Sequence, residues 1–185
     1  YSLYGIVTYT AVINYADTLI PFLFGERYVN IGGYCKEMFL TMIILPTVLL
    51  QANYLIARKK ELIDMKFNLV SLVLNISISC IGLYFVKSMS VINYAIFISF
   101  LVFHILQDIY FVKNSITNLI HPLLFYSVSI LTIVLYNLAL TQFQSPYVFI
   151  LFWSCVFGLT YFAFILKKDL FTNHLVPPIK YFRNN

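Results

Sequence analysis

The sequence predicts an all-α polytopic membrane protein, and two observations carry this prediction. Of the 185 residues, 61% are hydrophobic and only 10% are charged, whereas a soluble domain is about 25% charged. The mean hydropathy is +0.86. The apolar residues also run in continuous stretches of about 20, which is the helix length that crosses a bilayer core, whereas a barrel strand needs only about 10 alternating residues. A soluble globular domain and a membrane β-barrel are therefore excluded.

Six apolar stretches are each long enough to form a transmembrane helix, and only short connections lie between them. We expect them to pack as one bundle. The predicted helices cover residues 5–24, 38–57, 67–86, 91–112, 119–140 and 147–166, and residues 167–185 follow as a short cytoplasmic tail.

A basic turn between the second and third predicted helices determines the expected orientation. Cytoplasmic loops carry an excess of Lys and Arg, and placing this turn inside also places nine of the twelve basic residues inside, with both ends of the chain. The three that remain outside are Arg27, Lys36 and Lys87. The topology-determining residues of the turn are Arg58, Lys59, Lys60 and Lys66.

The charge and the cysteines argue against other classes of site. The net charge of +5 comes from residues in short gaps between apolar segments, not from a contiguous basic face, so no nucleic-acid binding is expected. The three cysteines lie in different segments without CxxC spacing or a nearby His, so we expect no disulfide, metal or other cofactor. Because the chain starts at Tyr1 and shows no signal peptide, we expect a piece of a longer protein.

Polar residues inside the predicted helices are candidates for a transport cavity. Asp17 and Asp108 are the only charged residues there, and each would cost a few kcal/mol in mid-membrane unless it is paired or hydrated. His104, four residues before Asp108, allows a His–carboxylate pair. The alternative for such residues is hydrogen bonding between helices, worth about 0.6 kcal/mol each. The cavity candidates are Asn14, Asp17, Gln51, Asn75, His104, Gln107 and Asp108.

Four stretches carry a family resemblance. Residues 19–28 read LIPFLFGERY, Gln51 and Ala57 precede the basic turn, Leu74-Asn75 places an amide inside the third helix, and residues 167–170 read KKDL. Together they resemble helix ends, an Asn-bearing helix core and the ending of the C-terminal half of a bacterial polysaccharide or O-antigen flippase, of the multidrug/oligosaccharidyl-lipid/polysaccharide exporter superfamily. Two departures are Arg58, where the family's turn usually has Gly, and residues 88–95, which replace a Gly-x-x-Gly-Ala-Ala stretch.

The resemblance implies a transporter with two six-helix bundles, of which this chain supplies one and the N-terminal half of the same protein the other. It would move a polyprenyl-pyrophosphate-linked oligosaccharide across the bacterial inner membrane for O-antigen, lipopolysaccharide or capsule biosynthesis, by alternating access and without enzymatic chemistry. Membrane lipids and a coupling H⁺ or Na⁺ are the further expected partners. The alternatives are a membrane-embedded polysaccharide polymerase or acyltransferase, which would be expected to have a sizeable external loop, and a drug or ion antiporter of the same superfamily.

Overall fold

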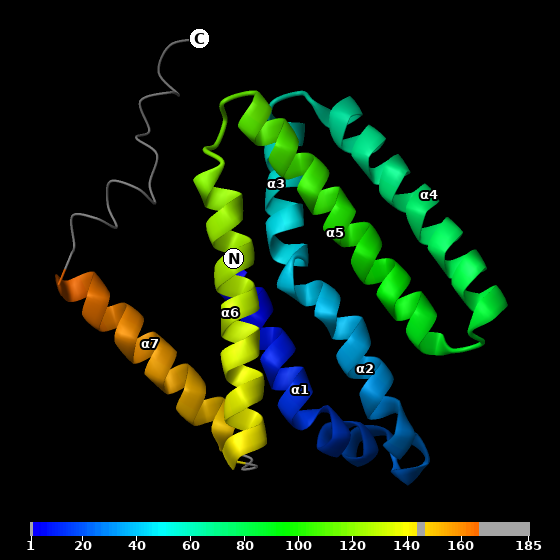
Figure 1. Ribbon diagram of the computed structural model, residues 1–185, viewed down its shortest axis with the longest axis vertical. Coiled ribbons are helices and arrows are strands. Elements are labelled where there is room, and N and C mark those ends of the chain that lie inside the picture. Colours follow the sequence, from blue (N-terminus) through cyan, green and yellow to red (C-terminus); the bar gives the residue numbers. More distant parts are fainter. Residues whose placement is uncertain (1, 144–146, 167–185) are drawn as a thin grey trace. The chain divides into compact units, whose positions relative to one another are not determined.

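The computed structural model describes residues 2–143 and 147–166, and these residues form helices with no strand among them. Two short 3-10 helices, η1 (Glu26–Ile31) and η2 (Leu40–Ile43), interrupt the α-helices (Figure 1). The α-helices are α1 (Ser2–Phe24), α2 (Gly32–Phe39), α3 (Leu45–Ala57), α4 (Glu61–Phe85), α5 (Met89–Lys113), α6 (Ile120–Phe143) and α7 (Val148–Leu166).

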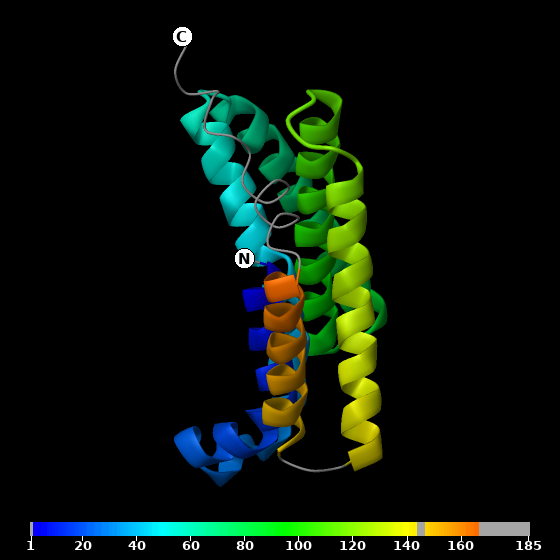
Figure 2. The same ribbon diagram turned by 90° about the vertical axis from the view of Figure 1, so that its left-hand side faces the viewer.

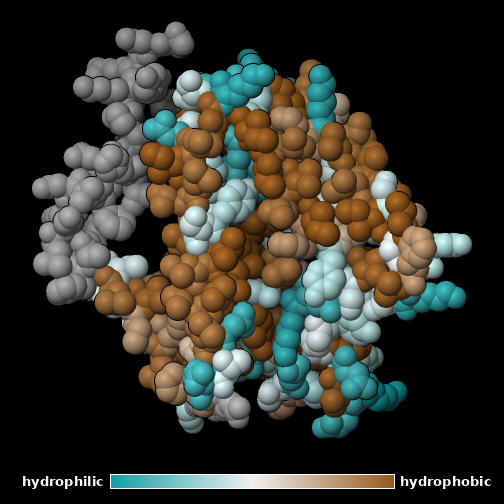
Figure 3. Space-filling model, in the orientation of Figure 1, coloured by the Kyte–Doolittle hydropathy of each residue, from teal (hydrophilic) through white to brown (hydrophobic). Residues whose placement is uncertain are grey.

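Five helical stretches among the described residues are long and apolar enough to cross a membrane: Leu3–Phe24, Glu26–Ala57, Glu61–Phe85, Met89–Lys113 and Ile120–Phe143. A shorter apolar stretch covers Val148–Tyr161. Hydrophobic side chains cover the middle of the helices and hydrophilic ones gather toward their ends (Figure 3). The prediction of an all-α polytopic membrane protein is confirmed.

The chain divides into two compact units, the first ending at Leu138 and the second beginning at Ala139, so the boundary lies within α6. In the first unit, α4 and α5 pack along each other as a hairpin, and the Ser71 hydroxyl of α4 donates to the Ser99 carbonyl of α5 at 2.8 Å. The second unit contains the end of α6 and α7. The expectation that all six helices form one bundle stays a prediction.

The second membrane stretch is discontinuous, which differs from the single helix expected over residues 38–57. Pro46 lies in the first turn of α3 and has no N–H to donate to the Met42 carbonyl, four residues earlier. That carbonyl instead meets Gly5 of α1 so closely that a Cβ on Gly5 would collide with it. The missing hydrogen bond and this close contact explain why α2 and α3 are separate helices joined by η2.

The ends of α1 and α4 follow from local chemistry. Gly25 ends α1 with φ of 95°, a conformation that other residues rarely adopt. α4 begins at Glu61, six residues earlier than the expected residue 67, because acidic Glu61 and Asp64 favour the first turn of a helix. Asp64 therefore lies on a helix and not in the loop.

Candidate functional site

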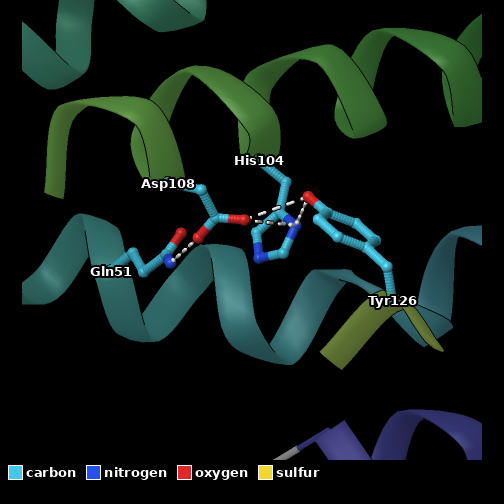
Figure 4. A network of polar contacts seen from close by, with 4 residues as sticks. All are labelled: Gln51, His104, Asp108 and Tyr126. Carbon is cyan, nitrogen blue, oxygen red and sulfur yellow. Dashed lines mark hydrogen bonds and ion pairs between the residues drawn. The ribbon is translucent and has the colours of Figure 1, made fainter. Parts of the chain in front are cut away.

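A network of four polar side chains lies between α3, α5 and α6 in the first unit (Figure 4). Gln51 Nε2 donates to Asp108 Oδ1 at 2.6 Å, and the Tyr126 hydroxyl donates to Asp108 Oδ2 at 3.0 Å. The same hydroxyl oxygen lies 2.7 Å from His104 Nδ1. Both carboxylate oxygens of Asp108 therefore accept a hydrogen bond from another helix.

The elements bring these residues together for simple geometric reasons. His104 and Asp108 are four residues apart, so they share one face of α5. That face is buried, with His104 1% and Asp108 7% exposed. The turn after α5 leads directly into α6 (Figure 2), and the early part of α6 lies close enough to the end of α5 for Tyr126 to reach the pair. The predicted pair of His104 and Asp108 is present. Nδ1 of His104 and Oδ2 of Asp108 lie 3.6 Å apart, and the Tyr126 hydroxyl contacts both atoms.

Hydrogen-bond counting assigns the tautomer of neutral His104. The single hydroxyl hydrogen of Tyr126 goes to Asp108, so its oxygen accepts from Nδ1–H of His104. Nε2 is then an acceptor, and it points away from Tyr126 toward α3 (Figure 4). Among the described residues, neither this nitrogen nor Gln51 Oε1 has a hydrogen-bond partner, although both atoms are buried. The site thus offers two acceptors.

A cavity of about 220 Å³ is lined by Gln51 and His104, the two residues that carry these acceptors. Gln51, His104 and Asp108 form its polar wall, and Thr47 and Phe125 add a hydroxyl-bearing and an aromatic side chain. The remaining lining residues are Phe111, Thr117, His121 and Pro122.

Gln107 extends the polar face of α5 to α4. Its Nε2 donates to Asp64 Oδ1 at 3.0 Å, and the Gln107 side chain is fully buried. Asp64 lies in the first turn of α4, a region that the sequence prediction placed in the cytoplasmic loop. The carboxylates of Asp64 and Asp108 are therefore both held by amide side chains at this end of the first unit.

A second polar cluster lies at the other end of α5. Glu37 of α2 accepts from the Ser90 hydroxyl at 2.9 Å and from Asn93 Nδ2 at 3.2 Å, and Asn93 Nδ2 also contacts the Tyr34 carbonyl at 3.1 Å. Asn93 and Asp108 are fifteen residues apart, or about 22 Å along a helix axis. One helix thus carries a polar cluster near each of its ends.

Asp17 is paired, which meets the requirement that a carboxylate in a predicted membrane helix be paired or hydrated. Lys36 of α2 forms an ion pair and a hydrogen bond with it. Lys36 lies in the connection before residue 38, outside the predicted apolar segments, so the sequence did not indicate it as a partner of Asp17. The Asp17 side chain is 63% exposed, so the site is far more open than that of Asp108.

The other predicted residues lie apart from the four-residue network. Asn14 is half-buried on α1, a helix that contributes nothing to that network. Asn75 is half-buried on α4 and accepts from the Ser79 hydroxyl at 3.2 Å. The basic residues of the predicted cytoplasmic turn are exposed: Arg58, Lys59, Lys60 and Lys66.

Sequence reasoning missed Tyr126, Lys36, Glu37 and Asp64 as site residues. Tyr126 is one of fifteen tyrosines, and nothing local distinguishes a tyrosine that faces a carboxylate from one that faces lipid. The three charged residues lie just outside the apolar segments, where a charge normally faces water. These three residues could have been identified by asking, for each charge next to an apolar segment, whether a neighbouring predicted helix carries an amide or a carboxylate that could bind it.

Comparisons with protein-family models, with curated proteins and with solved structures gave no match. The resemblance to polysaccharide flippases therefore stays a prediction, and the function has to be inferred from the site itself.

Proposed function

We propose that this chain forms part of a transporter that moves a lipid-linked polar cargo across a membrane. The observation that carries the proposal is the buried Asp108 carboxylate, held by Gln51 and Tyr126 inside apolar helices. An ionisable residue in a membrane helix is costly and usually marks a substrate or ion pathway. The adjoining cavity and the unpartnered acceptors of His104 and Gln51 favour a binding role over simple helix association.

The discontinuous second membrane stretch supports the same proposal. Transporters often build their binding sites from broken helices, where irregular backbone lines a cavity. Here α3 begins after the η2 break and contributes Thr47 and Gln51 to the cavity wall. In a continuous helix the first turn of α3 would point in another direction, so the positions of Thr47 and Gln51 in the cavity wall depend on the helix break.

The two polar clusters of α5 suit an alternating-access cycle. The Glu37 cluster joins α2 to the start of α5, and the Asp108 network joins α3 and α6 to its end. With the basic α3–α4 turn in the cytoplasm, as the positive-inside rule predicts, the Asp108 network lies near the cytoplasmic face and the Glu37 cluster near the external face. Opening of one cluster while the other stays closed would admit cargo from one side at a time.

The cargo that we propose is a polyprenyl-pyrophosphate-linked oligosaccharide, moved from the inner to the outer leaflet of a bacterial inner membrane. The flippase resemblance supplies this identity, with a second bundle from the N-terminal half of the protein and with H⁺ or Na⁺ as coupling ion. Flipping needs a polar path for sugars beside an apolar path for the lipid. No bond of the cargo has to be broken.

Deletion of the gene in its native host tests the proposal. We expect lipid-linked oligosaccharide to accumulate in membrane extracts while surface polysaccharide is lost, and the full-length wild-type gene to reverse both effects. Asp108→Asn should restore neither at equal membrane abundance, whereas the exposed Lys87→Gln should restore both. Loss of surface polysaccharide without accumulation of the lipid-linked precursor would instead indicate an earlier enzymatic step and contradict transport.

A further inference from the structure

A second cavity lies against the polar one in the first unit. It has a volume of about 350 Å³ and is lined by residues of α5 and α6 together with Leu119. Its wall is mostly apolar, with Ile105, Ile109 and Leu123 on it. Asp108 and Pro122 line both cavities. An apolar groove and a polar, aromatic cavity therefore share one wall.

Lys113 lies at the end of this groove that is nearest the α5–α6 turn. It occupies the last turn of α5, is exposed, and has no ion-pair partner among the described residues. Five residues, or about 7.5 Å along the helix, separate it from Asp108. A phosphate beside Lys113 would thus avoid the Asp108 carboxylate, whose oxygens already accept bonds from Gln51 and Tyr126.

The apolar groove, Lys113 and the polar cavity each suit a different kind of chemical group. The groove suits a hydrocarbon chain, the Lys113 ammonium suits a phosphate at the membrane surface, and the polar cavity suits a group rich in hydroxyls. That last preference follows from the two unpartnered acceptors, His104 Nε2 and Gln51 Oε1, which need donors. The volume of about 220 Å³ fits a single ring-sized group and not a whole oligosaccharide.

We propose that this juxtaposition is a loading site for a prenyl-phosphate-linked sugar, with the prenyl chain in the groove, the phosphate at Lys113 and the first sugar in the polar cavity. The proposal rests on the transport function given above and locates the cargo at the α5–α6 side of the Asp108 network. Sugar hydroxyls donate to His104 Nε2 and Gln51 Oε1, and the Phe125 ring provides an apolar surface for the sugar face. An ordinary anionic phospholipid would use only the groove and Lys113.

Binding to the full-length protein in neutral-lipid nanodiscs tests the proposal with two probes: farnesyl diphosphate and farnesyl diphosphate linked to N-acetylglucosamine. Lys113→Gln should weaken both probes about tenfold, which equals about 1.4 kcal/mol and follows from loss of a charged partner. Lys87→Gln, a matched lysine in the α4–α5 connection, should bind both as the wild type does. Equal binding by Lys113→Gln and wild type would overturn the phosphate assignment.

A cavity-filling variant tests the sugar assignment. Thr117→Phe places a ring in the polar cavity without touching the four-residue network, and should reduce the affinity of the sugar-bearing probe to that of the sugarless one. Ile116→Phe adds a ring at the neighbouring residue, which does not line this cavity, and should change neither affinity. An unchanged advantage of the sugar-bearing probe in Thr117→Phe would refute the proposal, as would its displacement by an equal concentration of phosphatidylglycerol.

Export measured with the same variants separates the two proposals. If neither probe binds but the gene still restores surface polysaccharide, the loading site is wrong while the transport function stands. If Thr117→Phe loses the sugar-bearing probe and still exports normally, the site is not on the transport path and the proposal fails as well. Loss of both binding and export in Thr117→Phe, with both retained in Ile116→Phe, is the expected result.

Discussion

The Tyr126 hydroxyl joins His104 to Asp108, and its removal tests whether the network is stronger than ordinary hydrogen bonding between helices. Tyr126→Phe removes the 3.0 Å bond to the carboxylate and the 2.7 Å contact with His104 Nδ1. A hydrogen bond to a charged group is worth about 1.5–3 kcal/mol, whereas interhelical hydrogen bonds in membranes average about 0.6 kcal/mol. We expect the free energy of unfolding to fall by about 2 kcal/mol, within the charged range.

Steric trapping in bicelles measures this free energy, and a double-mutant cycle with Asp108→Asn isolates the contact. Tyr110→Phe is the matched control, because the Tyr110 ring packs on Phe67 while its hydroxyl has no hydrogen bond among the described residues. We expect a coupling energy of at least about 1.5 kcal/mol. A value near or below about 0.6 kcal/mol, or equal losses in the two Tyr→Phe variants, would refute the reasoning.

Three further predictions concern the rest of the first unit and the topology. Reversal of the exposed pair, as Asp17→Lys with Lys36→Asp, should leave the unfolding free energy within about 1 kcal/mol of wild type, and either single change should lower it more than the double change does, as measured by steric trapping. Gly5→Val should destabilise by about 1–3 kcal/mol, measured by steric trapping, because its Cβ would collide with a main-chain carbonyl of η2. Single cysteines at Lys60 and Thr141, in a background without the native cysteines, should react with a membrane-impermeant maleimide from opposite sides of the membrane.

Each of these predictions has a clear contrary result. A double charge reversal that unfolds as readily as the worse single variant would show that the pair is not formed. Wild-type stability of Gly5→Val would show that α1 does not approach the helix break closely. Labelling of both Lys60→Cys and Thr141→Cys from outside intact cells would contradict the predicted six-helix topology.

The sequence was sufficient to predict the fold class, because the fold class depends on composition and on the length of the apolar stretches. Apolar stretches of about 20 residues form helices in a membrane whatever they pack against, since every backbone polar group must be satisfied within the segment. The helix break was not predicted, because the loss of one hydrogen bond at Pro46 is tolerated in many membrane helices. Its consequence here depends on Gly5, which is distant in sequence and close in space.

The candidate site was predictable only where the information is local. His104 and Asp108 share a helix face by their spacing, and Gln51 was a candidate as an isolated amide in an apolar run. Tyr126 could not be assigned, because its role depends on how the turn after α5 positions the start of α6. Lys36 could not be assigned to Asp17 either, because their pairing depends on how α2 folds back against α1 after Gly25.

Transbilayer movement of the lipid-linked oligosaccharide, extracted from the deletion strain and fluorescently labelled, tests the central claim most directly. The full-length protein is reconstituted in liposomes, and a membrane-impermeant quencher reports the labelled lipid in the outer leaflet. We expect wild type and Lys87→Gln to exchange the labelled lipid between leaflets, and Asp108→Asn to do so at least about tenfold more slowly, a barrier difference of about 1.4 kcal/mol. Movement by wild type no faster than in protein-free liposomes, or equal rates for wild type and Asp108→Asn, would contradict the account.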